Sequence, residues 1–166
     1  MTARLGVERI KERWATYAEG LNEGGHDEAT RARLMAQIAL WRNVYVAESD
    51  AQAEDELSQL LLDTRRHMLH VRDMYNPKDF VIDPMMLNPW TDPTVGDAES
   101  LAYTLETGCL YGSPQRVQEQ VAELREAGVQ HLLCQTGFGD MSQEQNLESM
   151  RRFGEQVMPA FRSSQE

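Results

Sequence analysis

The fold is decided by residues 111–162, which read YGSPQRVQEQVAELREAGVQHLLCQTGFGDMSQEQNLESMRRFGEQVMPAFR. Ser113 can accept a hydrogen bond from the first turn of a helix, and Pro114 has no N–H group to leave unpaired there. Gly128 can adopt the left-handed conformation that ends a helix. Between these residues, apolar side chains recur on one helical face: Val117, Val121 and Leu124. The pattern predicts a helix that begins at Pro114 and ends before Gly128.

A short strand and a second helix follow. Residues 131–136 are apolar in their middle and are closed by a glycine-containing turn at residues 137–140, which is typical of a buried strand that ends in an open loop. Ser142 can cap the last helix, and Gly154 and Pro159 weaken its later turns. Its inward stripe is formed by Leu147, Met150, Phe153, Val157 and Phe161. This order of helix, strand and helix is typical of a parallel sheet covered by helices.

Two stretches of the chain resemble one known family. The later stretch contains GSPQRVQEQVAELREAGVQHLLCQ, then GFG, then QNLESMRRFGEQVMPAFR, and it is similar to the C-terminal end of the luciferase-like flavin-dependent monooxygenases. The earlier stretch, residues 40–53, reads LWRNVYVAESDAQA and is similar to a strand of that family with its following helix. The resemblance covers most of the chain outside roughly residues 70–106.

Length limits what this resemblance implies. A complete (β/α)8 barrel takes about 250 residues and rarely fewer than about 200, whereas this chain has 166. We therefore expect an α/β fold that is a partial (β/α)8 barrel, with one leading helix and then the last three strand–helix units. We expect a single C-terminal half-barrel domain over residues 1–166, with an insertion or lid at about residues 74–106. The family's N-terminal half has no counterpart here.

Periodicity and turn signals predict the remaining elements. The expected elements are a helix at residues 7–22, a polar connection at 26–33, a strand at 37–47, a helix at 51–72 capped by Asp50, a short helix at 99–106 and a strand at 108–111. Four prolines interrupt residues 74–98, where the apolar side chains are too numerous for a free linker. This segment is either a lid at the barrel mouth or an excursion that packs on the outer helices or on a partner.

Composition indicates a cytoplasmic protein. The net charge of −11 disfavours nucleic acid and anionic membranes as partners, and no apolar run approaches the roughly 20 residues of a membrane-spanning helix. We expect Cys109 and Cys134 to be free thiols on adjacent strands. His67 and His70 lie three residues apart, which is typical of an amphipathic helix, and no metal site is expected.

The carboxyl ends of parallel strands meet at one rim, where a (β/α)8 barrel places its active site. Gly112 and Ser113 lie at this rim before a helix N-terminus, whose free N–H groups suit a phosphate or carboxylate; a plain helix cap is the alternative. Gly137, Phe138 and Gly139 follow the last strand. They either let the backbone or Phe138 approach a flavin ring or substrate, or form an ordinary turn with Phe138 in the core.

Arg42 and Asn43 are the polar exceptions in the first predicted strand, whose two faces are otherwise largely apolar. A buried polar side chain needs a hydrogen-bond partner. One of these residues could line a flavin or substrate cavity, or both could be satisfied by hydrogen bonds within the protein.

No nucleophile and general base emerge from the sequence, and a flavin enzyme does not need them because the cofactor supplies the redox chemistry. The resemblance implies FMN, as reduced flavin acting with oxygen on a small organic substrate, or a deazaflavin in some branches. A second hypothesis is a non-catalytic half-barrel. Since three parallel strands cannot close into a barrel, we expect either a homo-oligomer or a complementing N-terminal half-barrel as the partner.

Overall fold

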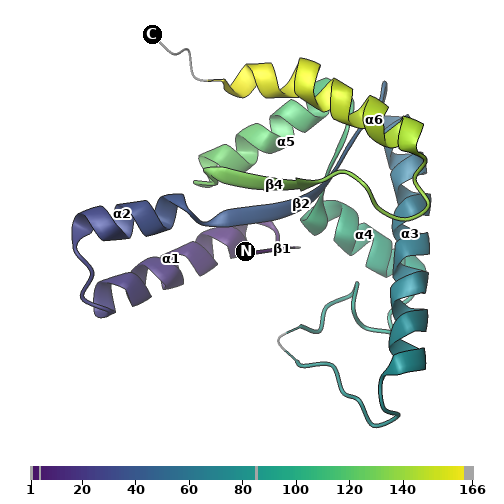
Figure 1. The fold of residues 1–166 in the computed structure, drawn as a ribbon, viewed down its shortest axis with the longest axis horizontal. Helices are drawn as coiled ribbons and strands as arrows, with labels where there is room; N and C mark the ends of the chain where they lie inside the picture. The colour runs from purple at the N-terminus through teal and green to yellow at the C-terminus, as the bar shows by residue number, and fades with distance from the viewer. Residues whose placement is uncertain (1, 4, 85, 163–166) are drawn as a thin grey trace.

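The structure is a computed structural model that describes residues 2–3, 5–84 and 86–162 (Figure 1). In these residues the strands are β1 (Thr2–Ala3), β2 (Ala39–Val46), β3 (Cys109–Gly112) and β4 (His131–Gln135). The helices are α1 (Val7–Glu23), α2 (Glu28–Ala36), α3 (Asp50–Tyr75), α4 (Asp97–Gly108), α5 (Pro114–Glu126) and α6 (Gln143–Arg152). The α/β class is confirmed. None of the described helices is both long and apolar enough to cross a bilayer.

One helix was not expected. Residues 26–33 were predicted to be a polar connection, but α2 begins at Glu28. Asp27 caps it by accepting a hydrogen bond from the Thr30 N–H group at 2.7 Å. No residue of α2 is buried, so this helix lacks the apolar stripe by which helices are recognised in a sequence.

β2 is the central strand of a parallel sheet. β4 pairs with residues 39–43 of β2 along one edge, while β3 pairs with residues 43–46 and β1 lies beside Leu40 and Trp41. Because Asn43 pairs with both β3 and β4, these two strands lie on opposite edges of β2. The prediction that the strands of Cys109 and Cys134 are adjacent is therefore wrong.

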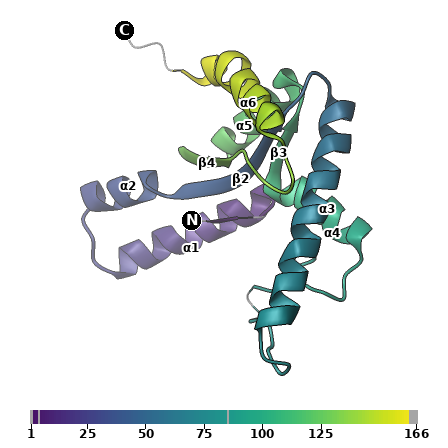
Figure 2. The ribbon, with the colours of Figure 1, turned by 45° about the vertical axis from the view of Figure 1, so that its right-hand side comes forward.

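The strand order places helices on both faces of the sheet. The chain crosses from β2 to β3 in one direction and then returns past β2 to β4. Because strand–helix–strand connections are right-handed, the two crossovers cover opposite faces, and Figure 2 shows α3 and α5 on different sides of β3. In a (β/α)8 barrel, by contrast, neighbouring strands follow one another in sequence and the helices all lie outside.

Two separate hydrophobic clusters match these two faces. Under α3 the cluster includes Tyr45, Leu57, Leu61, Trp90, Tyr111 and Phe138. Under α1 and α5 it includes Ile10, Leu40, Val44, Leu110, Val117 and Leu124. The alternation of Leu40, Val44 and Val46 with Asn43 and Tyr45 thus follows the period of two expected for a strand covered on both sides.

The described residues 76–84 and 86–96 form neither helix nor strand, as predicted, and one arginine holds the later part of this segment against α3. Arg65 is 3% exposed. Its guanidinium donates to the carbonyl oxygens of Trp90, Asp92 and Val95 and to the Asp97 carboxylate, over distances of 2.7 to 3.3 Å. The segment lies at the end of α3 remote from β2 (Figure 1). Trp90 is buried, but four apolar side chains that we expected to be shielded are exposed: Phe80, Val81, Met86 and Leu87.

The last helix crosses the carboxyl end of β2. Ser142 and Gln145 form a capping box at its start, and the Val46 N–H group donates to the Ser149 hydroxyl at 2.9 Å. After Arg152 the backbone widens into a π turn at Phe153–Val157 and then tightens into a 3₁₀ turn at Met158–Phe161. The expected weakening around Gly154 and Pro159 therefore takes the form of irregular helical turns.

Candidate functional site

The carboxyl ends of β2 and β3 lie at the position where open parallel sheets commonly bind ligands. β2 leads into α3 on one face of the sheet, and β3 leads into α5 on the other face. The chain therefore leaves these two neighbouring strands toward opposite faces of the sheet. Crevices at such a switch in direction are the usual ligand sites of doubly wound sheets. Asp50 and Arg116, in the first turns of α3 and α5, lie at this position.

A carboxylate of the chain itself occupies the N-terminus of α5. The Ser113 N–H group donates to Asp50 Oδ1 at 2.7 Å, and the Ser113 hydroxyl accepts from the Arg116 N–H group. The hydrogen bond from Ser113 lowers the pKa of Asp50. We expected Asp50 to cap α3, but Ser49 does so by accepting from Gln52. Asp50 instead provides the negative charge that a helix N-terminus attracts.

Gly112 permits this contact. Its φ of +134° is a conformation that side-chain-bearing residues rarely adopt. A Cβ atom here would lie 2.8 Å from Asp50 Oδ1 and 2.8 Å from Arg116 Cδ. Glycine at this position therefore lets the Asp50 carboxylate reach α5.

Arg116 joins the carboxylate to an aromatic ring. Its guanidinium carbon lies 4.9 Å from the centre of the Tyr111 ring, within the range of a cation–π interaction. One of its nitrogens lies 3.8 Å from Asp50 Oδ2. Burial raises the pKa of Tyr111, so its hydroxyl is protonated at neutral pH and can act as a hydrogen-bond donor.

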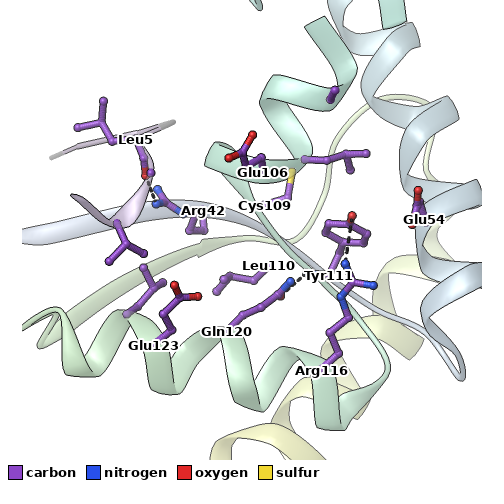
Figure 3. Close-up of a pocket in the computed structure, with 15 residues that line it drawn as sticks. Leu5, Arg42, Glu54, Glu106, Cys109, Leu110, Tyr111, Arg116, Gln120 and Glu123 are labelled. Atoms are coloured by element: carbon purple, nitrogen blue, oxygen red, sulfur yellow. Dashed lines mark hydrogen bonds between the residues drawn. The ribbon is translucent and has the colours of Figure 1, made fainter. Parts of the chain in front are cut away.

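A groove of about 470 Å³ runs along the outer edge of β3 (Figure 3). It is bounded by the approach to α1, by α4 and by α5. Its polar lining includes Arg42, Glu54, Glu106, Arg116, Gln120 and Glu123, and its apolar lining includes Leu5, Leu105 and Leu110. The volume lies within the range of about 300–1,000 Å³ typical of small-molecule sites.

A side chain takes the place of the next strand in this groove. The Tyr111 N–H group donates to Gln120 Oε1 at 2.9 Å. Gln120 thereby satisfies a backbone group that would otherwise be free to pair with another chain.

The structure separates Arg42 from Asn43. Arg42 faces the α5 side and donates to the carbonyl oxygens of Leu5 at 2.7 Å and Trp41 at 3.0 Å. Burial lowers its pKa to about 10. Asn43 faces the α3 side, where its amide lies 3.7 Å from the Cys109 sulfur. Both residues thus have partners within the protein, and Arg42 also lines the groove.

The Gly137-Phe138-Gly139 turn packs on α3. Phe138 is 8% exposed and belongs to the cluster under that helix. Gly139 has a φ of +60°, and a Cβ atom there would lie 2.6 Å from the Leu60 carbonyl oxygen. The turn is therefore in contact with the helix backbone.

Of the predicted site residues, Gly112 and Ser113 lie together at the carboxyl end of β3, Arg42 lines the groove, and Asn43 and residues 137–139 lie elsewhere. Asp50 and Gln120 were not predicted to be members of the site. Asp50 follows a strand directly, which was a usable signal, but Gln120 looked like an ordinary polar residue of α5. Within residues 2–3, 5–84 and 86–162, no group of three or more His, Cys, Asp or Glu side chains could hold a metal ion.

The fold resembles that of known monooxygenases. Monooxygenase RslO1 from Streptomyces bottropensis matches with a TM-score of 0.65 and 17% identity, over 94% of this chain and 39% of that chain. A type II Baeyer–Villiger monooxygenase, the oxygenating constituent of 3,6-diketocamphane monooxygenase from Pseudomonas putida, in complex with FMN, matches with a TM-score of 0.59 and 21% identity, over 93% of this chain and 40% of that chain. This chain thus spans about two fifths of either neighbour's length. No protein-family profile and no curated protein sequence matches it.

Proposed function

We propose that this chain corresponds to the C-terminal portion of a luciferase-like flavin-dependent oxidoreductase, with its strands in the order β3-β2-β4 here rather than in the sequential order of a (β/α)8 barrel. The observation that supports this most is the fold similarity over 93% of the chain to a monooxygenase in complex with FMN. In the proposed reaction, reduced flavin supplies the redox chemistry with oxygen, and the protein binds and orients a small organic substrate. FMN is the expected flavin, and a deazaflavin is the alternative.

The N-terminus of α5 does not fit the flavin phosphate. The Asp50 carboxylate already accepts the Ser113 N–H group there, and a phosphate would meet that negative charge at close range. Ser113 and Gly112 therefore fit an internal contact better than a cofactor contact, and we assign no step to them.

The groove beside β3 fits a neutral organic ring better than a phosphate. Glu54, Glu106 and Glu123 line it, while Arg42 is committed to backbone carbonyls and Arg116 to Tyr111 and Asp50. A negatively charged ligand would be repelled by the three carboxylates. We propose that the flavin ring or the organic substrate lies in this groove, between α4 and α5.

Titration of the chain with FMN and with riboflavin, followed by flavin fluorescence, tests the proposal. We expect saturable quenching by micromolar protein, with FMN binding no more tightly than riboflavin. Leu105→Trp fills the groove and should abolish quenching, whereas Leu147→Trp, on the exposed side of α6, should not. Absence of quenching by either flavin would overturn the proposal.

The second candidate is a non-catalytic half-barrel that acts as a partner subunit. The Asp50–Ser113 contact favours it, because a chain that binds no flavin phosphate has no reason to keep this helix N-terminus open. Failure of both titrations, with the chain still folded by circular dichroism, would support this alternative.

A further inference from the structure

One end of the groove beside β3 carries a hydroxyl, a guanidinium and a carboxylate. Tyr111 belongs to β3, Arg116 to the first turn of α5, and Glu54 to α3 near its start. All three line the groove. Figure 3 shows them at the end of the groove remote from Leu5. These polar groups come from three separate elements, which meet at the carboxyl ends of β2 and β3.

Arg116 fixes the direction in which the Tyr111 hydroxyl can donate. One nitrogen of the guanidinium donates to the hydroxyl oxygen at 3.5 Å. A guanidinium has no acceptor atom, so the hydroxyl proton points away from Arg116. Arg116 is itself held by the Tyr111 ring and by Asp50. The hydroxyl therefore has one proton to donate, in a direction set by the protein.

Glu54 supplies an acceptor at the same end of the groove. Burial raises the pKa of Tyr111, and the Glu54 carboxylate raises it further while Arg116 lowers it. The two side chains thus interact electrostatically. Glu54 is exposed, so its carboxylate oxygens can accept a hydrogen bond from a ligand. A ligand at this end of the groove meets one donor, Tyr111, and one acceptor, Glu54.

We propose that Tyr111 and Glu54 bind the polar edge of the flavin ring, with the Tyr111 hydroxyl donating to a ring carbonyl oxygen and the Glu54 carboxylate accepting from the adjacent ring N–H group. The pyrimidine part of an oxidised flavin is uncharged and presents an N–H group between two carbonyl groups. It therefore needs a donor beside an acceptor. Leu105 and Leu110 supply apolar lining for the rest of the ring.

This inference rests on the proposed function and assigns the groove to the flavin ring rather than to the organic substrate. A substrate without an N–H group would leave the Glu54 carboxylate without a partner on binding, which costs free energy. The flavin ring satisfies both groups. Arg116 is a positioning residue in this arrangement, because it acts through the Tyr111 hydroxyl.

Titration of the wild-type chain with riboflavin and with 3-methylriboflavin, followed by flavin fluorescence, tests the inference without any variant. The methyl group replaces the hydrogen of the ring N–H group and leaves both carbonyl groups in place. We expect 3-methylriboflavin to bind at least ten-fold more weakly than riboflavin. Glu54→Ala should remove most of that difference, because the acceptor is then absent.

Tyr111→Phe tests the donor. Loss of one hydrogen bond should weaken riboflavin binding about three- to ten-fold, and the carbonyl stretching bands of bound riboflavin should move to higher frequency in the infrared spectrum. Tyr75→Phe, at an exposed tyrosine at the end of α3, should change neither the affinity nor the bands. Circular dichroism checks that each variant is folded.

The outcomes separate this inference from the proposed function. Riboflavin binding with equal affinity for 3-methylriboflavin, or with carbonyl bands that Tyr111→Phe leaves in place, would overturn the inference and leave the proposed function standing. Absence of riboflavin binding by the wild-type chain would overturn both.

Discussion

β3 and β4 pair with the same central strand, yet their surroundings differ. β3 lies between α3 and α5 and is buried at every residue, and Gln120 satisfies its outer edge. β4 is followed by α6, which packs over β2, so β4 keeps an exposed face and a free edge. The difference shows that the shielding of a parallel strand depends on where its following helix docks. The predictions below alter one side of β2 or the other.

The largest effect is expected at Arg65, which binds the segment before α4 on the β3 side of the sheet. Arg65→Ala removes the donor of three backbone carbonyls and of Asp97, and should lower the free energy of unfolding by about 3–5 kcal/mol, because four hydrogen bonds to a charged group are lost and each contributes about 1.5–3 kcal/mol. Arg66→Ala also removes a bond to Asp97, but Arg66 is exposed, so we expect about 0–1 kcal/mol. Urea unfolding of both variants measures the difference; equal effects would contradict the role of Arg65.

A smaller effect is expected on the β4 side. Gly139→Ala combines backbone strain of about 1–2 kcal/mol with a clash against the Leu60 carbonyl worth about 1–3 kcal/mol. Gly25 has a similar φ of +70° but nothing within 4 Å of its Cβ position, so Gly25→Ala isolates the strain. Thermal unfolding should show a lower melting temperature for Gly139→Ala than for Gly25→Ala.

Removing the Gln120 side chain should leave the outer edge of β3 as unprotected as that of β4. Gln120→Ala leaves the Tyr111 N–H group without its partner, at a cost of about 1–2 kcal/mol. The Tyr111 amide should then exchange with solvent faster. Gln115→Ala is the control, because Gln115 lies on the same helix and its side chain bonds to exposed Glu119. An unchanged Tyr111 exchange rate in Gln120→Ala would show that water replaces the glutamine without consequence.

The smallest effect concerns pH. The hydrogen bond from Ser113 lowers the pKa of Asp50 in the folded protein, whereas in the unfolded chain it is about 3.9. Its contribution to stability is therefore present above about pH 4 and is lost as the pH falls through the lowered value. Asp50→Asn should weaken the acid dependence of the urea midpoint and accelerate exchange of the Ser113 amide. Asp27→Asn, at the cap of α2, should leave that amide unaffected.

The sequence predicted most elements because their signals are local. Capping residues and apolar stripes identified α1, α3, α5 and α6, and the alternation along residues 38–47 identified β2 with its two faces. The inward stripe predicted for α6 was wrong in part, because Leu147 and Met150 are exposed. Strand order is not local, since it depends on which edge of β2 accepts β4, and here the prediction of adjacent β3 and β4 was wrong. The same holds for the site. Gly112 and Ser113 were located at the rim from local signals, but their partner Asp50 was not identified because it lies 63 residues from Ser113.

The Asp50–Ser113 bond also bears on how fast the chain folds. It closes a loop of 63 residues, and the pairing of β2 with β3 closes loops of similar size, such as the one between Asn43 and Cys109. Contacts so distant in sequence form late and slow the search for the native topology. Since the entropy of closure changes by only about 0.6 kcal/mol for each doubling of loop length, shortening residues 76–89 should alter equilibrium stability little. The 26 residues of α3 lie within this loop, so early formation of the helix would shorten the flexible chain that has to close.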